Sequence, residues 1–105
     1  MSQDAPRIAR RQVVILNALG LHLRPANKFV GMAMQYRSEI RVVSGGEAVN
    51  GKSILELATL AAEQGTRLDL EADGPDAEAA VAALAELVAA GFYEDDDGDS
   101  VERPS

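Results

Sequence analysis

The chain has 105 residues, ten Lys or Arg against 17 Asp or Glu, and a formal net charge of −7. This length fits one domain, the lack of cysteine excludes disulfides and thiolate chemistry, and a single histidine argues against a His-based zinc site. No apolar run approaches the roughly 20 residues of a membrane span, and the N-terminus lacks the apolar segment of a signal peptide. We therefore expect a cytoplasmic protein with no membrane partner, no metal and no cofactor.

The acidic residues are concentrated at the C-terminal end. Residues 94–105 hold six of the 17 acids and one base, so the rest of the chain carries 11 acids against nine bases. This near-balance, with no Trp and few aromatic residues, excludes a nucleic-acid binder, which needs a basic face and stacking side chains. We predict one folded domain over residues 1–92, with a loose arm over 1–6, and an acidic disordered tail over 93–105.

The first elements in chain order are a strand and a helix. Residues 7–16 are rich in β-branched side chains and place Val13 and Ile15 on one face, which predicts a strand. Residues 23–36 repeat apolar side chains at three- and four-residue spacing, which predicts a helix. Pro25 falls in its first turn, where a missing N–H costs nothing.

A hairpin and a second helix follow. Residues 39–43 alternate charged and apolar side chains, 44–46 give a glycine turn, and 47–50 form the returning strand. Ser53 is a good N-cap, and Glu56 three residues later predicts a capping box. The short apolar helix that begins at residue 54 is predicted to end at Gly65, as a C′ glycine.

The last elements are a strand and a helix. Strict alternation over 67–72 predicts a strand with Leu68, Leu70 and Ala72 inward. A helix is predicted over 77–90 and is closed by Gly91. Its buried stripe consists of Val81, Leu84, Leu87 and Val88. The order β-α-β-β-α-β-α predicts an α+β open-faced sandwich, a four-stranded antiparallel sheet with its helices packed on one face.

His22, the only histidine, lies where the first strand gives way to the first helix. The first N–H groups of a helix have no intrahelical acceptor and lie at the positive end of its dipole, which favours an anion. Arg24 adds a planar cation suited to phosphate, and a neutral imidazole is a competent nucleophile. The pattern is compatible with a histidine that accepts a phosphoryl group, although a lone histidine near a helix start is more often a polar cap or a surface residue.

Three blocks resemble one family in order and spacing. Residues 17–26 (NALGLHLRPA) resemble the active-site segment of HPr, the histidine phosphocarrier of the bacterial phosphoenolpyruvate-dependent phosphotransferase system. Residues 49–57 (VNGKSILEL), and 64–66 (QGT) followed by 72–77 (ADGPDA), support the resemblance, which covers about residues 11–92. It implies four antiparallel strands covered by three helices on one side.

The resemblance also implies a mechanism and partners. His22 would take a phosphoryl group from phosphorylated enzyme I and pass it to a IIA-type protein of a sugar or nitrogen branch. The backbone N–H of Leu23 and the Arg24 side chain would stabilise the phosphoryl oxygens, in a carrier rather than an enzyme. We expect a monomer that docks its partners through an apolar patch of Leu23, Asn27, Gly31, Ile54, Leu55 and Ala58, with one of Ile54 and Leu55 buried and the other exposed.

Ser53 supports an alternative function. In HPr proteins of some bacteria the matching serine is phosphorylated by an ATP-dependent HPr kinase, and a dianion is tolerated at a helix N-terminus. The alternative is a regulatory HPr paralogue that is controlled by phosphorylation on His22 or Ser53 and acts by binding partner proteins. A simple N-cap also explains the serine.

Residues 46–53 match the phosphate-loop pattern G-x-x-x-x-G-K-[ST] letter for letter. Such a loop follows a strand buried in a parallel sheet. Residues 39–43 instead alternate with charged side chains, and residues 47–50 alternate like a hairpin strand. We therefore interpret the match as a coincidence.

Overall fold

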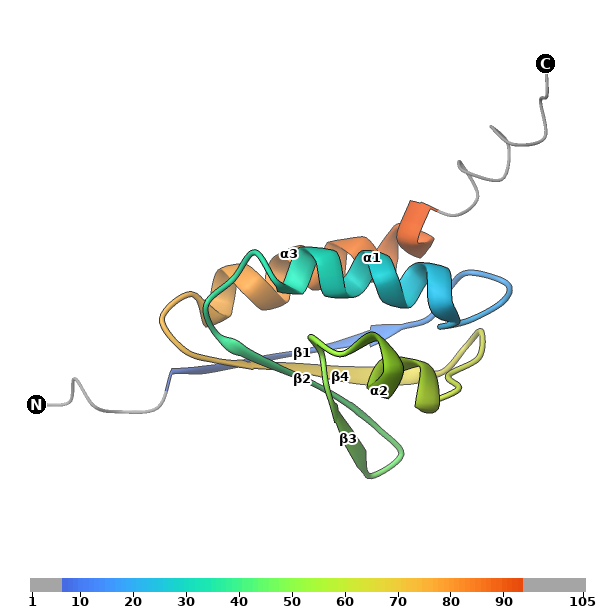
Figure 1. The fold of residues 1–105 in the computed structure, drawn as a ribbon, viewed down its shortest axis with the longest axis horizontal. Helices are drawn as coiled ribbons and strands as arrows, with labels where there is room; N and C mark the ends of the chain where they lie inside the picture. Colours follow the sequence, from blue (N-terminus) through green and yellow to red (C-terminus); the bar gives the residue numbers. More distant parts are fainter. Residues whose placement is uncertain (1–6, 94–105) are drawn as a thin grey trace, which may run out of the picture.

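The computed structural model describes residues 7–93 as a sheet with helices against it (Figure 1). The predictions for the N-terminal arm (1–6) and for all but the first residue of the acidic tail (94–105) lie outside the described residues. The elements in chain order are β1 (Ile8–Val14), α1 (Leu23–Ala33), β2 (Glu39–Ser44), β3 (Glu47–Asn50), α2 (Ile54–Thr59), β4 (Arg67–Asp73), α3 (Ala77–Ala89) and a short 3₁₀ turn, η2 (Gly91–Tyr93).

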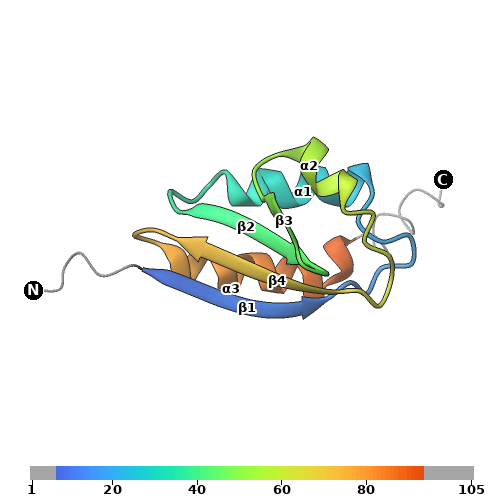
Figure 2. The same ribbon diagram turned by 90° about the horizontal axis from the view of Figure 1, so that it is seen from below.

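The four strands form one antiparallel sheet in the order β1-β4-β2-β3. β4, the last strand in the chain, lies between β1 and β2. The centre of the sheet therefore joins segments that are far apart in sequence. Figure 2 shows α2 beside α1, over the part of the sheet nearest β3. The predicted α+β open-faced sandwich is confirmed.

Strand alternation decides which face is covered. In β4 the side chains of Leu68, Leu70 and Ala72 are at most 2% exposed, as predicted, while their neighbours along the strand are not buried. In β1, Val13 is buried and Val14 exposed. α1 and α3 cover the apolar face with their own apolar stripes, because removing these side chains from water is the main favourable term in folding.

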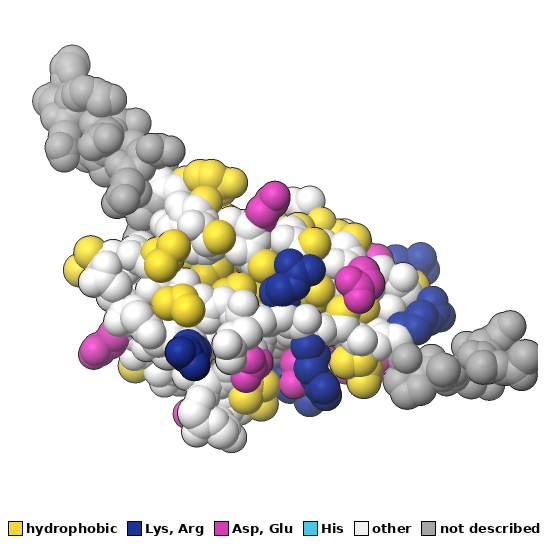
Figure 3. Space-filling view, turned by 180° about the vertical axis from the view of Figure 1, so that it is seen from behind, with side chains coloured by type: hydrophobic (Ala, Val, Ile, Leu, Met, Phe, Trp, Pro, Cys, Tyr) yellow, Lys and Arg dark blue, Asp and Glu magenta, His cyan; other side chains and the backbone are white. Residues whose placement is uncertain are grey.

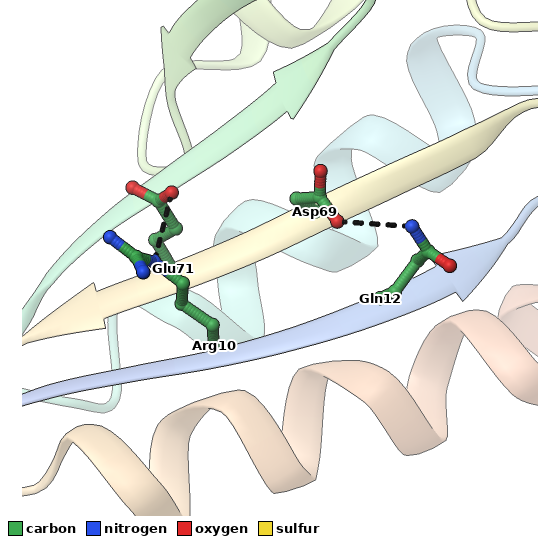
Figure 4. Close-up of polar contacts among 4 residues, drawn as sticks. All are labelled: Arg10, Gln12, Asp69 and Glu71. Carbon is green, nitrogen blue, oxygen red and sulfur yellow. Dashed lines mark hydrogen bonds and ion pairs between the residues drawn. The ribbon is translucent and has the colours of Figure 1, made fainter.

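The other face of the sheet is polar and solvated. Arg10 of β1 forms an ion pair with Glu71 of β4, with 3.3 Å between nitrogen and oxygen, and the Gln12 amide donates to Asp69 at 3.4 Å (Figure 4). Cross-strand pairs of this kind contribute a few tenths of a kcal/mol each to the sheet, so they help to keep this face soluble rather than to drive folding.

The back of the molecule mixes charges of both signs with apolar side chains (Figure 3). No single-sign field covers the part of that surface that the structure describes.

Asp76, the N-cap residue of α3, ties that helix to the segment between α1 and β2. Its carboxylate accepts from the Ser38 hydroxyl at 2.6 Å and from the backbone N–H groups of Arg37 and Ser38 at 2.8 and 2.9 Å. These hydrogen bonds, the Ser38 hydroxyl first, lower the pKa of Asp76 from its ordinary 3.8 to about 2, because they favour the charged form.

The predicted ends of two helices need correction. α1 ends at Ala33 rather than Tyr36, and the next residues continue in tighter i→i+3 turns. α2 ends at Thr59, so the residue after its C-cap is Ala61, with φ 49°, and not Gly65. Gly65 instead donates its N–H to Ile15 at 2.8 Å. This hydrogen bond pairs the segment before β4 with the segment after β1. The long-range pairing, and not the glycine signal, therefore decides where α2 ends.

The capping box forms only in part. Ser53 accepts from the Glu56 N–H at 3.2 Å, as predicted. The Glu56 carboxylate, however, accepts from the N–H of Asn50 at 2.8 Å instead of reaching Ser53. The Ser53 N–H donates to the Asn50 carbonyl, so the turn after β3 takes the place of the missing half of the box.

Candidate functional site: a histidine at the start of α1

A tight loop between β1 and α1 sets the position of His22. Asn17 is buried, and its side-chain amide donates to the Gly20 carbonyl at 2.7 Å, while the Gly20 N–H donates back to the Asn17 carbonyl at 3.2 Å. The Gly20 carbonyl also accepts from the His22 N–H at 3.1 Å. The Asn17 side chain and the His22 backbone are thus both hydrogen-bonded to the Gly20 carbonyl.

Gly20 lies against the backbone of the segment after α2. It has φ 76°, and a Cβ at this position would overlap the Ala62 carbonyl oxygen and lie 2.9 Å from the Glu63 Cα. The next residue, Leu21, donates its N–H to the same Ala62 carbonyl at 2.8 Å and buries its side chain. Only glycine allows this approach, and the approach fixes the direction in which the chain enters α1.

His22 is the N-cap residue of α1, as the sequence predicted. Its backbone is extended (φ −97°, ψ −168°), and its carbonyl accepts from the Ala26 N–H at 3.0 Å, the first helical bond. The residue is partly exposed, its Nε2 atom is buried, and the ring does not cap the helix. The histidine therefore lies partly at the surface, at the position that directly precedes the first amides of α1.

Those amides belong to Leu23 and Arg24, the first two residues of α1. They have no carbonyl four residues earlier within the helix, and none of the backbone bonds between elements of the described chain uses them. The Arg24 side chain is exposed, and no carboxylate of residues 7–93 pairs with it. The first turn of α1 also contains no acidic residue. The start of α1 is therefore positive and ready to receive an anion.

The opposite face of α1 anchors this arrangement in the core. Pro25, Ala26, Phe29 and Ala33 are buried, at three- and four-residue spacing. Pro25 is the third residue of the helix, where its missing N–H breaks no helical bond, so the prediction of a first-turn proline is confirmed. The same helix thus buries one side and presents His22 and Arg24 at its end.

Lys28 adds a contact that the sequence did not predict. Its ammonium donates to the carbonyl of Phe92 in η2 at 2.8 Å, 64 residues away. Phe92 is completely buried. The apolar residue after the closing glycine was the only available signal, and it did not reveal which helix it packs against.

The proposed docking residues lie on α1 and α2, which pack side by side. Leu23 is 60% exposed and Leu55 75%, and Asn27 and Gly31 are also exposed. Ala58 and Ile54 are half-buried. Of the Ile54–Leu55 pair, Leu55 is the exposed member, while Ile54 packs against the core rather than being fully buried. We call these six residues the helix patch.

The segment that matches the phosphate-loop pattern is not a loop. Glu47–Asn50 is strand β3, paired with β2, and Gly45 and Gly46 form the hairpin turn before it. The Lys52 ammonium donates to the Tyr36 carbonyl at 2.8 Å. The interpretation of the match as a coincidence is confirmed by this geometry, since no glycine-rich cradle is present in these residues.

Two further findings concern metal binding and membrane spans. Within residues 7–93, no group of three or more His, Cys, Asp and Glu side chains could hold a metal ion. In the same part of the chain, no helix has the length and apolarity to cross a membrane. The fold and the site define a small domain that presents one imidazole at a positive helix start as an anion-receiving centre.

Known proteins are similar to this chain in sequence and in fold. Residues 9–90 match the family described as PTS HPr component phosphorylation site. The phosphocarrier protein HPr of Neisseria meningitidis serogroup A is 45% identical over 85 residues, which are 81% of this chain and 96% of that protein. The crystal structure of HPr-C-His from Thermoanaerobacter tengcongensis superposes with a TM-score of 0.77 at 38% identity, covering 80% of this chain and 94% of that one.

A longer protein also contains a similar segment. The multiphosphoryl transfer protein of Escherichia coli O157:H7 is 36% identical over 98 residues, which are 89% of this chain and 26% of that protein. The chain belongs to the HPr family of phosphocarrier proteins of the phosphotransferase system. The predicted family is confirmed.

Proposed function

We propose that His22 accepts a phosphoryl group on Nδ1 from phosphorylated enzyme I and passes it to IIA-type proteins. The observation that carries this proposal is the place of His22 as N-cap of α1, beside the first amides of the helix. Burial of Nε2 favours Nδ1 as the reacting atom, because a phosphorylated partner cannot approach a nitrogen that is shielded from solvent.

The start of α1 supplies the charge stabilisation that the transfer needs. We expect the N–H groups of Leu23 and Arg24 and the Arg24 guanidinium to bind the phosphoryl oxygens while the phosphorus moves. A helix dipole stabilises an anion at this position by about 0.3–1 kcal/mol. The donor and acceptor proteins complete the positioning of the reacting atoms, so the transfer needs no metal bound to this chain.

Exposure of the site suits a carrier. The phosphohistidine is the product of one transfer and the substrate of the next, so both partners must reach His22 in turn. The helix patch beside it, with Leu23 and Leu55 exposed, supports docking through a small and transient interface. On the same grounds we propose a monomer in the cytoplasm. The acceptor IIA protein decides between a sugar and a nitrogen branch.

Ser53 is a candidate for regulation and stays a prediction. The residue is half-buried, and its hydroxyl accepts from the Glu56 N–H as the cap of α2. An HPr kinase would have to reach that hydroxyl at the start of α2. The phosphate would then lie at a helix N-terminus, where its charge is tolerated.

Labelled phosphoenolpyruvate with enzyme I tests the proposal. We expect acid-labile label on the chain and none on His22→Ala. Arg24→Ala is expected to slow the transfer without changing stability, because an exposed arginine contributes little to folding. Arg67→Ala, which removes the same charge from the polar face of the sheet, serves as its control and should transfer at the unaltered rate.

Other outcomes would contradict the proposal. Equal transfer by Arg24→Ala and Arg67→Ala would remove Arg24 from the mechanism. Label that enters only from ATP, and is lost in Ser53→Ala, would favour the regulatory alternative. Binding of magnesium-ATP without either label would revive the nucleotide-binding interpretation.

A further inference from the structure

The turn η2 lies beyond residues 9–90, the part of the chain that the family match covers, and its backbone is unusual. Gly91, Phe92 and Tyr93 have φ values of 65°, 57° and 59°. Left-handed backbone is rare for residues other than glycine, and two in succession persist only where the surrounding structure holds them. Something in the fold therefore holds η2 in place.

Two contacts tie η2 to α1 and the core. The side chain of Phe92 is completely buried, as part of the same core as the sheet and the helices. The Lys28 ammonium donates to the Phe92 carbonyl at 2.8 Å from the half-buried side of α1. Lys28 lies four residues after Arg24, so both side chains leave the same face of the helix. Figures 1 and 2 show η2 at the same end of the molecule as the start of α1.

η2 also passes close to the loop before α1. A Cβ added to Gly91 would lie 3.9 Å from the Asn17 Cβ, so the Gly91 backbone is a neighbour of Asn17. Asn17 is buried and donates to the Gly20 carbonyl, which in turn accepts from the His22 N–H. Asn17 therefore lies between η2 and the histidine in a short series of neighbouring residues.

We infer that η2 is a positioning element for the phosphoryl acceptor, and that Phe92 and Lys28 are positioning residues of His22. The inference rests on the proposed function of His22. The histidine lies where the loop that passes Gly91 at Asn17 meets the helix that η2 contacts through Lys28. Without η2 both supports loosen, and fewer encounters with a partner bring the imidazole into line with the phosphorus.

Transfer is sensitive to such loosening. The reacting atoms must approach to about 3–3.5 Å in alignment, and a misplacement of about 1 Å that originates far from the chemistry can slow a reaction on the order of a hundredfold. Docking through the helix patch does not involve η2. Loss of η2 is therefore expected to lower the maximal transfer rate more than it raises the KM for enzyme I.

Phe92→Ala, Phe92→Leu and Lys28→Met test the inference, with Val42→Ala in β2 as a control for lost core packing, since Val42 is also completely buried. Two quantities are measured: phosphoryl transfer as a function of enzyme I concentration, and amide hydrogen exchange at Gly20 and His22. We expect Phe92→Ala and Lys28→Met to lower the maximal rate about tenfold or more and to speed exchange at both amides. Phe92→Leu should restore most of the rate. Val42→Ala should leave both the maximal transfer rate and the exchange at Gly20 and His22 close to those of the unaltered chain.

Maximal rates in Phe92→Ala and Lys28→Met equal to the unaltered chain or to Val42→Ala would overturn the inference, because η2 would then serve stability alone. If Phe92→Ala does not fold, Lys28→Met decides, since it keeps the aliphatic stem and removes only the donor. Failure of the unaltered chain to take label on His22 would refute the proposed function instead. Exchange at Gly20 and His22 would still show whether η2 holds the loop.

Discussion

Replacing Gly20 with alanine is expected to destabilise the protein and to displace the loop that presents His22. Two separate costs arise at this position. The backbone has φ 76°, and an added methyl group would meet the Ala62 carbonyl oxygen and the Glu63 Cα. Those atoms belong to backbone, which cannot turn away as a flexible side chain could.

The magnitude follows from the two costs. An alanine in left-handed backbone costs about 1–2 kcal/mol, and forcing a methyl group into packed surroundings costs about 1–3 kcal/mol more. We therefore expect Gly20→Ala to lower the free energy of unfolding by about 2–5 kcal/mol, a large part of the 5–15 kcal/mol typical of a domain. Gly45→Ala separates the costs, because Gly45 has φ 56° but nothing within 4 Å of an added Cβ. It should lose only about 1–2 kcal/mol.

Urea unfolding followed by far-ultraviolet circular dichroism measures both variants, since the chain has no tryptophan to report by fluorescence. An unchanged slope with a lower midpoint would show that stability itself has changed. Gly20→Ala should also lower the Tm by about 10–25 °C and slow phosphoryl transfer to His22. A loss in Gly20→Ala no greater than that in Gly45→Ala would refute the close approach between Gly20 and Ala62.

Three further variants test other parts of the structure. Ala61→Gly should raise the free energy of unfolding by about 0.5–1 kcal/mol by relieving the φ of 49° after α2, and a lower midpoint in urea would contradict that conformation. Ser53→Ala should lose about 1 kcal/mol through the lost cap of α2, and thermal unfolding at unaltered Tm would show that the cap contributes nothing. Because the folded pKa of Asp76 is about 2 against an ordinary 3.8, its contribution is present above about pH 4 and lost as the pH falls to about 2. The stability difference between the unaltered chain and Asp76→Asn should shrink over that window, and a constant difference would show that hydrogen bonds from Ser38 do not hold the charge.

Local sequence patterns predicted the architecture well. Period-two alternation located β2, β3 and β4 to within a residue, because each strand has one face toward the helices and one toward water. Ends of helices were less certain. The glycine signal predicts that α2 ends at Gly65, because glycine is the usual C′ residue. In the structure Ala61 has the positive φ, and Gly65 is hydrogen-bonded to Ile15 instead.

The site was predicted in part. The sequence placed His22 before a helix and Arg24 within its first turn, and both are there. The sequence does not predict the residues that hold the histidine: Asn17 and Gly20 belong to the motif of residues 17–26, which gives no indication of their contacts, and no pattern singles out Lys28. Their roles depend on partners at Ala62 and Phe92, more than 40 residues away in sequence.

By itself, the sequence determined the periodicity of the elements, the covered face of the sheet, and the pairing of an imidazole with a helix start. These are local properties, since they depend on side chains within a few residues of one another. Only the tertiary structure decided that the Gly20 backbone meets Ala62 and that η2 returns to α1 through Lys28. Such contacts join segments that come together only when the core closes, and no local pattern encodes their distance.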